Sequence, residues 1–151
     1  MKGFELKCYP RGLGRKVYRV IQIGDTASLD ELCLCILDSL NLGEPWEHLY
    51  EIVLGTKLYK RGSYCIPCPR IEEVYEYNSD GVNTDLQIGA LHLYKGYKFM
   101  FHYDFGDDIV VMINVTKRLE ELSHSYPLVV KEQGMLGYGG FYDDEDDETE
   151  E

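Results

Sequence analysis

The sequence contains no apolar run of about 18 residues, the length that a membrane-spanning helix needs. Its N-terminus, MKGFELKCYP, also lacks the apolar segment of a secretory signal peptide. It has no glycine-rich phosphate loop and no His-Arg-Asp loop, so the Asp-Phe-Gly at residues 104–106 does not indicate a kinase. We therefore expect a cytoplasmic protein that has no membrane partner and is not a kinase.

Basic residues are scarce, since 15 lysines and arginines stand against 27 acids, for a net charge of −12. Eight of the acids lie in residues 143–151, which contain no base and too little apolar surface to fold. The rest of the chain is nearly balanced, and its basic clusters at 11–16 and 57–61 are short, so no clear nucleic-acid surface is predicted. We expect a single domain over residues 1–142 and a disordered acidic tail over 143–151.

The five cysteines are odd in number in a chain without an export signal, which favours reduced thiols over disulfides. Cys65 and Cys68 have the two-residue spacing of metal and redox sites. Pro67 and Pro69 oppose the helix that normally carries a redox pair, and a structural zinc needs two further ligands. We predict ordinary loop thiols and no cofactor, with zinc at Cys65 and Cys68 as the alternative.

Apolar and polar residues alternate over residues 97–115, a pattern that predicts two half-buried strands joined by an acidic turn. Their apolar stripes are Tyr97, Phe99, Phe101, Tyr103 and Phe105, then Ile109, Val111, Ile113 and Val115. Facing stripes require a connection with an odd number of residues, which predicts the loop Gly106-Asp107-Asp108 with Phe105 opposite Ile109. Asp108 would take a left-handed conformation, which aspartate tolerates.

A capping box at residues 28–31 begins a helix whose apolar face continues to Leu40. Further strands are predicted at residues 4–9, 17–23, 46–54, 57–60 and 74–77. Residues 61–83 are predicted to form a long loop, and residues 84–91 a short helical turn. Residues 116–124 are predicted as helix or strand, and irregular structure is expected from Pro127.

Candidate functional side chains gather around the acidic turn. Asp104, Asp107 and Asp108 could ligate a divalent cation, although aspartates in a turn also bond to nearby backbone N–H groups. His102 and Asp104 lie two residues apart on one strand, a spacing at which a carboxylate can orient an imidazole for acid–base chemistry. Without an identifiable nucleophile, the alternative is a polar pair without catalysis. The catalytic candidates are His102, Asp104 and Asp107, and the binding candidates are His48, Tyr50, Tyr103, Asp104, Asp107 and Asp108.

The acidic turn also carries a family resemblance. Its marks are Ser28-Leu29, Trp46, His48-Leu49-Tyr50-Glu51, Tyr103-Asp104-Phe105-Gly106-Asp107-Asp108, Tyr126-Pro127 and Gly139-Gly140. With these residues the chain resembles the plasmid pRiA4b open-reading-frame-three-like family, whose members include passenger proteins of insertion elements. The resemblance implies an α+β fold with a curved, mainly antiparallel sheet. With the helix and the short helical turns predicted above, we expect this sheet to pack against one main helix. It implies mobile-element context and no established activity.

This chain departs from the family pattern after the turn, where Ile109 stands in place of the usual tryptophan and no histidine follows soon after. We predict a non-enzymatic binding or accessory protein of mobile-element origin, acting on an unknown protein or small-molecule partner. One alternative is a metal-dependent hydrolase or nuclease-like enzyme that uses residues 104–108. Another is a protein whose acidic tail mimics nucleic acid or engages a basic partner.

Overall fold

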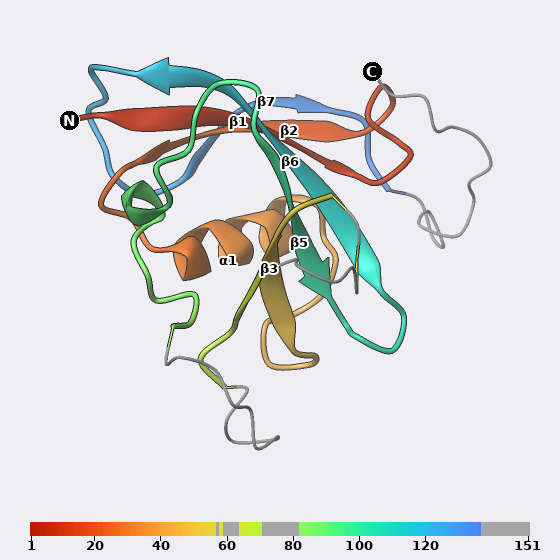
Figure 1. Cartoon of the computed structure of the whole chain (residues 1–151). Helices are drawn as coiled ribbons and strands as arrows, with labels where there is room; N and C mark the ends of the chain where they lie inside the picture. Colours follow the sequence, from red (N-terminus) through yellow and green to blue (C-terminus); the bar gives the residue numbers. More distant parts are fainter. Residues whose placement is uncertain (57, 59–63, 71–81, 137–151) are drawn as a thin grey trace.

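The computed structural model describes residues 1–56, 58, 64–70 and 82–136, which form one curved antiparallel sheet packed against one helix (Figure 1). The elements are β1 (Gly3–Pro10), β2 (Tyr18–Gly24), α1 (Leu29–Ser39), β3 (Tyr50–Leu54), β4 (Tyr64–Pro67), the 3-10 helix η1 (Ile88–Leu91), β5 (Lys98–Tyr103), β6 (Ile109–Leu119) and β7 (Leu128–Gln133). The strands are ordered β4-β3-β5-β6-β1-β2-β7. The α+β fold expected from the family resemblance is confirmed.

The predicted helix begins where its capping box places it. The Ser28 side chain accepts a hydrogen bond from the Glu31 backbone N–H at 3.0 Å, and Glu31 accepts one from the Ser28 N–H at 3.4 Å. Both bonds satisfy N–H groups that a helix start leaves without partners. No helix among the described residues is long and apolar enough to span a membrane.

The last turn of α1 contains no basic residue, and Arg19 of β2 supplies the missing positive charge. The buried Arg19 guanidinium donates to the carbonyl of Ser39 at 3.0 Å and to those of Gln133 and Gly134 at 3.1 and 3.0 Å. A cation at this end offsets the partial negative charge of the helix dipole. Arg19 thereby joins α1 to the β2–β7 edge of the sheet.

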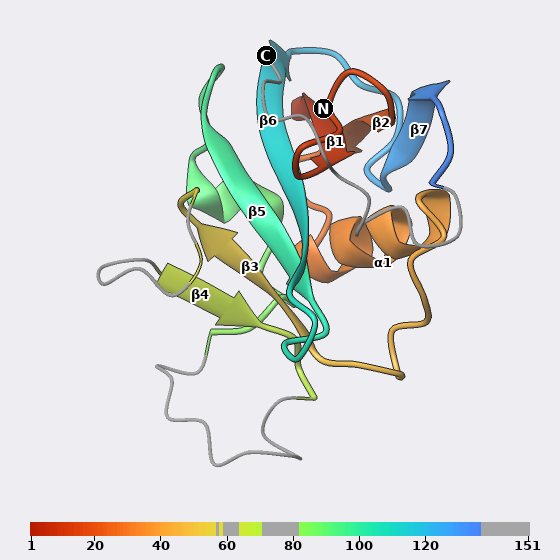
Figure 2. The same ribbon diagram turned by 90° about the vertical axis from the view of Figure 1, so that its right-hand side faces the viewer.

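The sheet bends around α1: in Figure 2, β4, β3 and β5 lie to the left of the helix, and β1, β2 and β7 lie above it. The main core lies on the face toward α1 and includes the predicted aromatic stripe from Phe99 to Tyr103. A smaller apolar cluster lies on the opposite face and contains Tyr9, Val53, Met100, Val110 and Met112. Because side chains alternate along a strand, β5 contributes to both clusters.

The hairpin between β5 and β6 forms as predicted, but its turn is longer. Tyr103 pairs with Ile109, so five residues, 104–108, make the connection, and the predicted pairing of Phe105 with Ile109 is wrong. The register differs by two residues, which keeps the paired residues of both stripes on their predicted face, whereas Phe105 lies in the turn and stacks on His102. Asp108 has the predicted left-handed conformation, with φ of 53°, and Asp104 also has a positive φ, of 65°.

Three other predictions need correction. The third strand begins at Tyr50, because residues 46–48 form a turn. The segment read as a long loop contains β4, and the segment read as irregular contains β7, at the two edges of the sheet. Residues 116–124 were predicted as helix or strand, and β6 continues through them as a strand as far as Leu119. The predicted strand at 74–77, most of that at 57–60, and the acidic tail lie outside the described residues.

Candidate functional site

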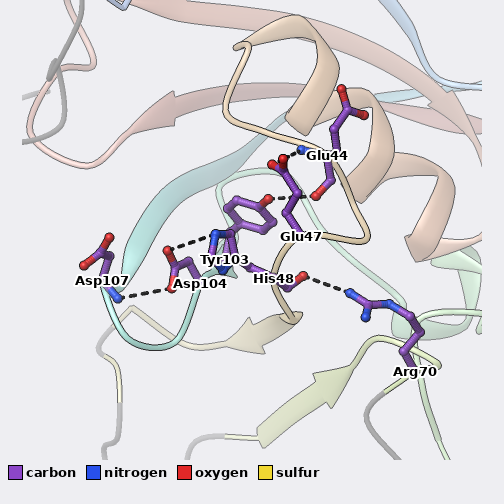
Figure 3. Close-up of polar contacts among 7 residues, drawn as sticks. All are labelled: Glu44, Glu47, His48, Arg70, Tyr103, Asp104 and Asp107. Atoms are coloured by element: carbon purple, nitrogen blue, oxygen red, sulfur yellow. Dashed lines mark hydrogen bonds and ion pairs between the residues drawn. The ribbon is translucent and has the colours of Figure 1, made fainter. Parts of the chain in front are cut away.

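Two connections meet where β5 ends and β3 begins: the loop of residues 42–49 and the acidic turn of residues 104–108 (Figure 3). The Asp104 N–H donates to the Leu49 carbonyl at 2.9 Å, which joins the two connections directly. Within the turn, the N–H groups of Asp107 and Asp108 both donate to the Asp104 carbonyl, at 3.0 and 2.7 Å. Most of the catalytic and binding candidates predicted from the sequence therefore lie at this end of the sheet.

Side chains from the domain brace the 42–49 loop through its carbonyl groups. The Tyr103 hydroxyl donates to the Glu44 carbonyl at 2.7 Å, and Arg70 donates to those of Pro45 at 2.7 Å and His48 at 3.1 Å. Burial and the nearby Glu47 raise the pKa of Tyr103 to about 12, so its hydroxyl keeps the proton that it donates. Trp46 lies in the middle of this braced loop with 68% of its surface exposed.

His48 and Asp104 form the exposed pair of the site. His48 Nε2 lies 3.6 Å from Asp104 Oδ2, too far for a hydrogen bond, and the His48 side chain is 47% exposed. The His48 ring packs edge-on against Tyr103, with the ring centroids 5.4 Å apart. The contact is an ion pair when the imidazole carries a proton, and solvent screens much of its strength.

His102 lies nearby but is fully buried on the sheet face away from α1. Its Nδ1 lies 2.8 Å from Glu51 Oε2 and its Nε2 lies 2.7 Å from Asp108 Oδ1, while Phe105 stacks on the ring at 4.9 Å. An imidazolium donates from both nitrogens and so satisfies both carboxylates. Burial lowers the pKa of His102, but the hydrogen bonds and charges of Glu51 and Asp108 outweigh it, and the net shift is upward.

This geometry changes the acid–base interpretation of the sequence. The partners of His102 come from β3 and from the end of the acidic turn, whereas Asp104, the predicted partner, lies beside His48. Because its ring is buried and bridges two carboxylates, His102 is placed to hold β3 against the turn. Glu51 was missed as a site residue, because its position opposite His102 follows from the pairing of β3 with β5.

Tyr50, another predicted binding residue, lies on the face toward α1. Its hydroxyl donates to Asp30 Oδ1 at 2.7 Å, and the Thr84 hydroxyl donates to the same oxygen at 2.7 Å. Burial and the Asp30 contact raise the pKa of Tyr50. With 4% of its surface exposed, Tyr50 braces the helix against β3 and does not reach the surface near Trp46.

The acidic turn does not gather its carboxylates around one point. Asp108 contacts His102, and Asp104 Oδ1 accepts a 3.4 Å hydrogen bond from the Asp107 N–H. Asp107 itself is exposed. Over the described part of the chain, no group of three histidine, cysteine, aspartate or glutamate side chains is placed to hold a metal ion.

The two cysteines with metal-like spacing point to opposite sides of the sheet. Cys65 packs against the cluster with Val53 and Met100, whereas Cys68 is part of the core that faces α1. Burial, with Glu51 next in effect, raises the pKa of Cys65 to about 11, and burial also raises that of Cys68. The two side chains lie on opposite sides of the sheet, and burial favours the protonated thiol at both. Cys65 lies in β4, not in a loop as predicted.

The sequence of this chain matches the model of a known protein family. The model of the family described as "Plasmid pRiA4b ORF-3-like protein" matches residues 2–137. The chain belongs to the plasmid pRiA4b ORF-3-like family. This membership agrees with the sequence resemblance, and the acidic turn that carried the resemblance is also the turn that closes the β5–β6 hairpin.

The fold of this pRiA4b ORF-3-like chain is shared with a solved structure. It is similar to the crystal structure of MM3350, a protein of unknown function from Methanosarcina mazei Go1, with a TM-score of 0.62 and 19% sequence identity. The similarity covers 93% of this chain and 76% of that one, and it concerns the fold alone. None of the curated proteins matches the sequence.

Proposed function

We propose that this pRiA4b ORF-3-like protein is a non-enzymatic binding protein, an accessory factor of mobile-element origin. Its contact region is the loop surface formed by Glu44, Trp46, Glu47, His48 and Asp107. The occupant is a protein segment that carries lysine or arginine next to an apolar side chain. The mobile-element context is consistent with the plasmid reading frame in the family's description.

The observation that carries the proposal is the exposure of Trp46 on a braced loop. Trp46 is the only tryptophan of the chain, and it is 68% exposed. Hydrogen bonds from Tyr103 and Arg70 hold the loop around it against the domain. Tryptophan is among the residues that contribute most to protein interfaces. A loop whose conformation is already fixed loses little entropy when a partner binds.

The charge around Trp46 indicates the chemistry of the partner. Glu44, Glu47 and Asp107 are exposed on the loop surface, and His48 is its exposed imidazole. Arg70 lies behind the loop, where its guanidinium is used in hydrogen bonds to the Pro45 and His48 carbonyls. These exposed acids favour a partner with basic side chains, and Trp46 supplies an apolar contact for that partner.

The same contacts favour binding over metal-dependent hydrolysis. A hydrolytic site needs carboxylates and an imidazole that converge on a reacting atom. Here Asp104 accepts a hydrogen bond from the turn backbone, and His102 is buried between two carboxylates. These side chains hold the turn in place, which supports a preformed contact surface.

The test uses affinity capture followed by fluorescence. Because Trp46 is the only tryptophan, its emission reports on the loop surface alone. We expect Trp46→Ala to lose a captured protein that the unmodified chain retains, and a synthetic basic segment of that protein to shift the Trp46 emission saturably. Added salt should weaken this binding, because the acids of the loop surface are exposed.

The matched control is Tyr126→Ala, which removes an aromatic ring that is 57% exposed outside the loop surface. This variant should capture the same protein as the unmodified chain. If Trp46→Ala captures the same set of proteins, or if the bound segment leaves the tryptophan emission unchanged, the loop surface is not the binding region and the proposal fails.

A further inference from the structure

A separate cavity lies at the other end of the β3–β5 pair from the loop surface. It has a volume of about 180 Å³ and is lined by Leu54, Leu91, His92, Leu93, Tyr94 and Tyr97. Its walls come from three segments: the end of β3, the chain that leaves η1, and the residue before β5. We call this cavity the aromatic hollow.

The backbone around the aromatic hollow is fixed by hydrogen bonds. The Tyr97 N–H donates to the Tyr94 carbonyl at 3.0 Å, which closes a four-residue turn, and the Gly96 N–H donates to the Val115 carbonyl of β6 at 2.7 Å. Gly96 has a φ of 93°, which suits the third position of a type II turn. The two tyrosines that line the hollow are thus the first and last residues of an anchored turn.

His92 is the residue in the lining of the hollow that carries an imidazole. It ends η1 in a left-handed conformation with φ of 52°, and its side chain is exposed. A left-handed residue is a common way for a helix to end, and the His92 N–H donates to the Gly89 carbonyl at this helix end. The imidazole can donate or accept a hydrogen bond, and the other residues that line the hollow are leucines and tyrosines.

The lining chemistry and the size together select a ligand class. The Tyr94 and Tyr97 rings lie 5.3 Å apart at 51° to each other, and Tyr94 is 62% exposed. One benzene ring fills an apolar cavity of about 150 Å³, so the half-open hollow of about 180 Å³ is large enough for a single aromatic ring. We propose that the aromatic hollow binds a small molecule with a single aromatic ring and a hydroxyl or similar polar substituent, which His92 recognises.

The first test is a titration of the full chain with 4-fluorophenol, followed by ¹⁹F NMR. We expect saturable broadening of the ligand signal, weakened roughly fivefold or more in Tyr94→Ala because a stacking partner is lost. Tyr94 is largely exposed, so this variant should fold. Tyr126→Ala, the matched control for loss of an exposed aromatic ring, should bind 4-fluorophenol like the unmodified chain. A signal that does not saturate at millimolar concentration, or equal binding by both variants, overturns the proposal.

A second arm tests the polar substituent and the source of the ring. Fluorobenzene should bind less tightly than 4-fluorophenol, and His92→Gly, which suits the left-handed backbone, should reduce that preference. N-acetyltyrosinamide represents the side chain of a partner protein. If it binds and 4-fluorophenol does not, the hollow receives a protein side chain and the small-molecule proposal fails. Trp46→Ala should leave 4-fluorophenol binding unchanged, because the loop surface lies at the other end of β5.

Discussion

His102 and His48 both lie beside carboxylates near the end of β5, yet they differ in almost every physical respect. His102 is fully buried and contacts Glu51 and Asp108 at hydrogen-bond distances, whereas His48 is 47% exposed and lies 3.6 Å from Asp104. A buried pair is costly to break, because removing one partner leaves a desolvated charge. The comparison assigns stability to the buried histidine and leaves the exposed one available for contacts with a partner.

The largest effect is expected from His102→Ala. This change leaves Glu51 and Asp108 without their shared cation and removes the ring that stacks on Phe105. We expect the free energy of unfolding to fall by about 3 kcal/mol or more. Urea denaturation followed by circular dichroism measures this fall. The matched change His48→Ala should alter the same quantity by less than about 0.5 kcal/mol. Similar losses in both variants would remove the distinction between the two histidines.

The second prediction separates the two carboxylates of the buried bridge. The Glu51 side chain is 13% exposed and that of Asp108 is 38% exposed, so solvent screens the Asp108 contact more strongly. We expect Glu51→Gln to lower the free energy of unfolding by about 2 kcal/mol and Asp108→Asn by about 1 kcal/mol. Asparagine suits the left-handed backbone at position 108, so the second change tests the charge and not the turn. The reverse order of losses would contradict this assignment.

The sequence predicted the parts of this region that local patterns determine. The capping box located α1, and the alternation of residues 97–115 identified the hairpin and its buried stripe. The loop length was wrong because a shift of two residues leaves every paired side chain on the same face, so alternation cannot distinguish the two registers. The outer strands β4 and β7 were missed. Pro67 obscures the first, and the second has the largely exposed pattern of an edge.

The partners of His102 could not be predicted, because they depend on contacts between segments far apart in the sequence. Glu51 faces His102 only because β3 pairs with β5, a neighbour relation that neither strand encodes alone. Asp104 was expected to share the face of His102, but the chain leaves the strand after Tyr103 and Asp104 turns into a left-handed conformation. Alternation no longer applies beyond that point.

A third, smaller effect concerns pH and the titration of His102. The pKa of this group is raised above its ordinary value of 6.5, so the folded state holds the proton more tightly than the unfolded state. The resulting stabilisation is fully present below the unfolded pKa, and it should be lost as the pH rises through the higher folded pKa. Urea titrations at several pH values from mildly acidic to mildly alkaline should show this decline.

The variants that test the pH effect are His102→Gln and His48→Gln. The first should abolish the part of the decline that His102 causes, because glutamine does not titrate. The second should retain it, since His102, Glu51 and Asp108 remain in place. A decline that persists in His102→Gln but disappears in His48→Gln would assign the pH response to the exposed pair instead.

The smallest effect is expected for the exposed pair itself. A double-mutant cycle with His48→Gln and Asp104→Asn isolates the coupling between the two side chains, and asparagine tolerates the positive φ at position 104. We expect a coupling below about 0.5 kcal/mol, reduced further by salt, because the atoms lie 3.6 Å apart and His48 is half exposed. If the coupling approaches that of a buried pair, His48 and Asp104 hold the acidic turn as His102 does. The loop surface would then depend on the His48–Asp104 pair for its shape, and binding variants at position 48 would report on folding as well as on contact.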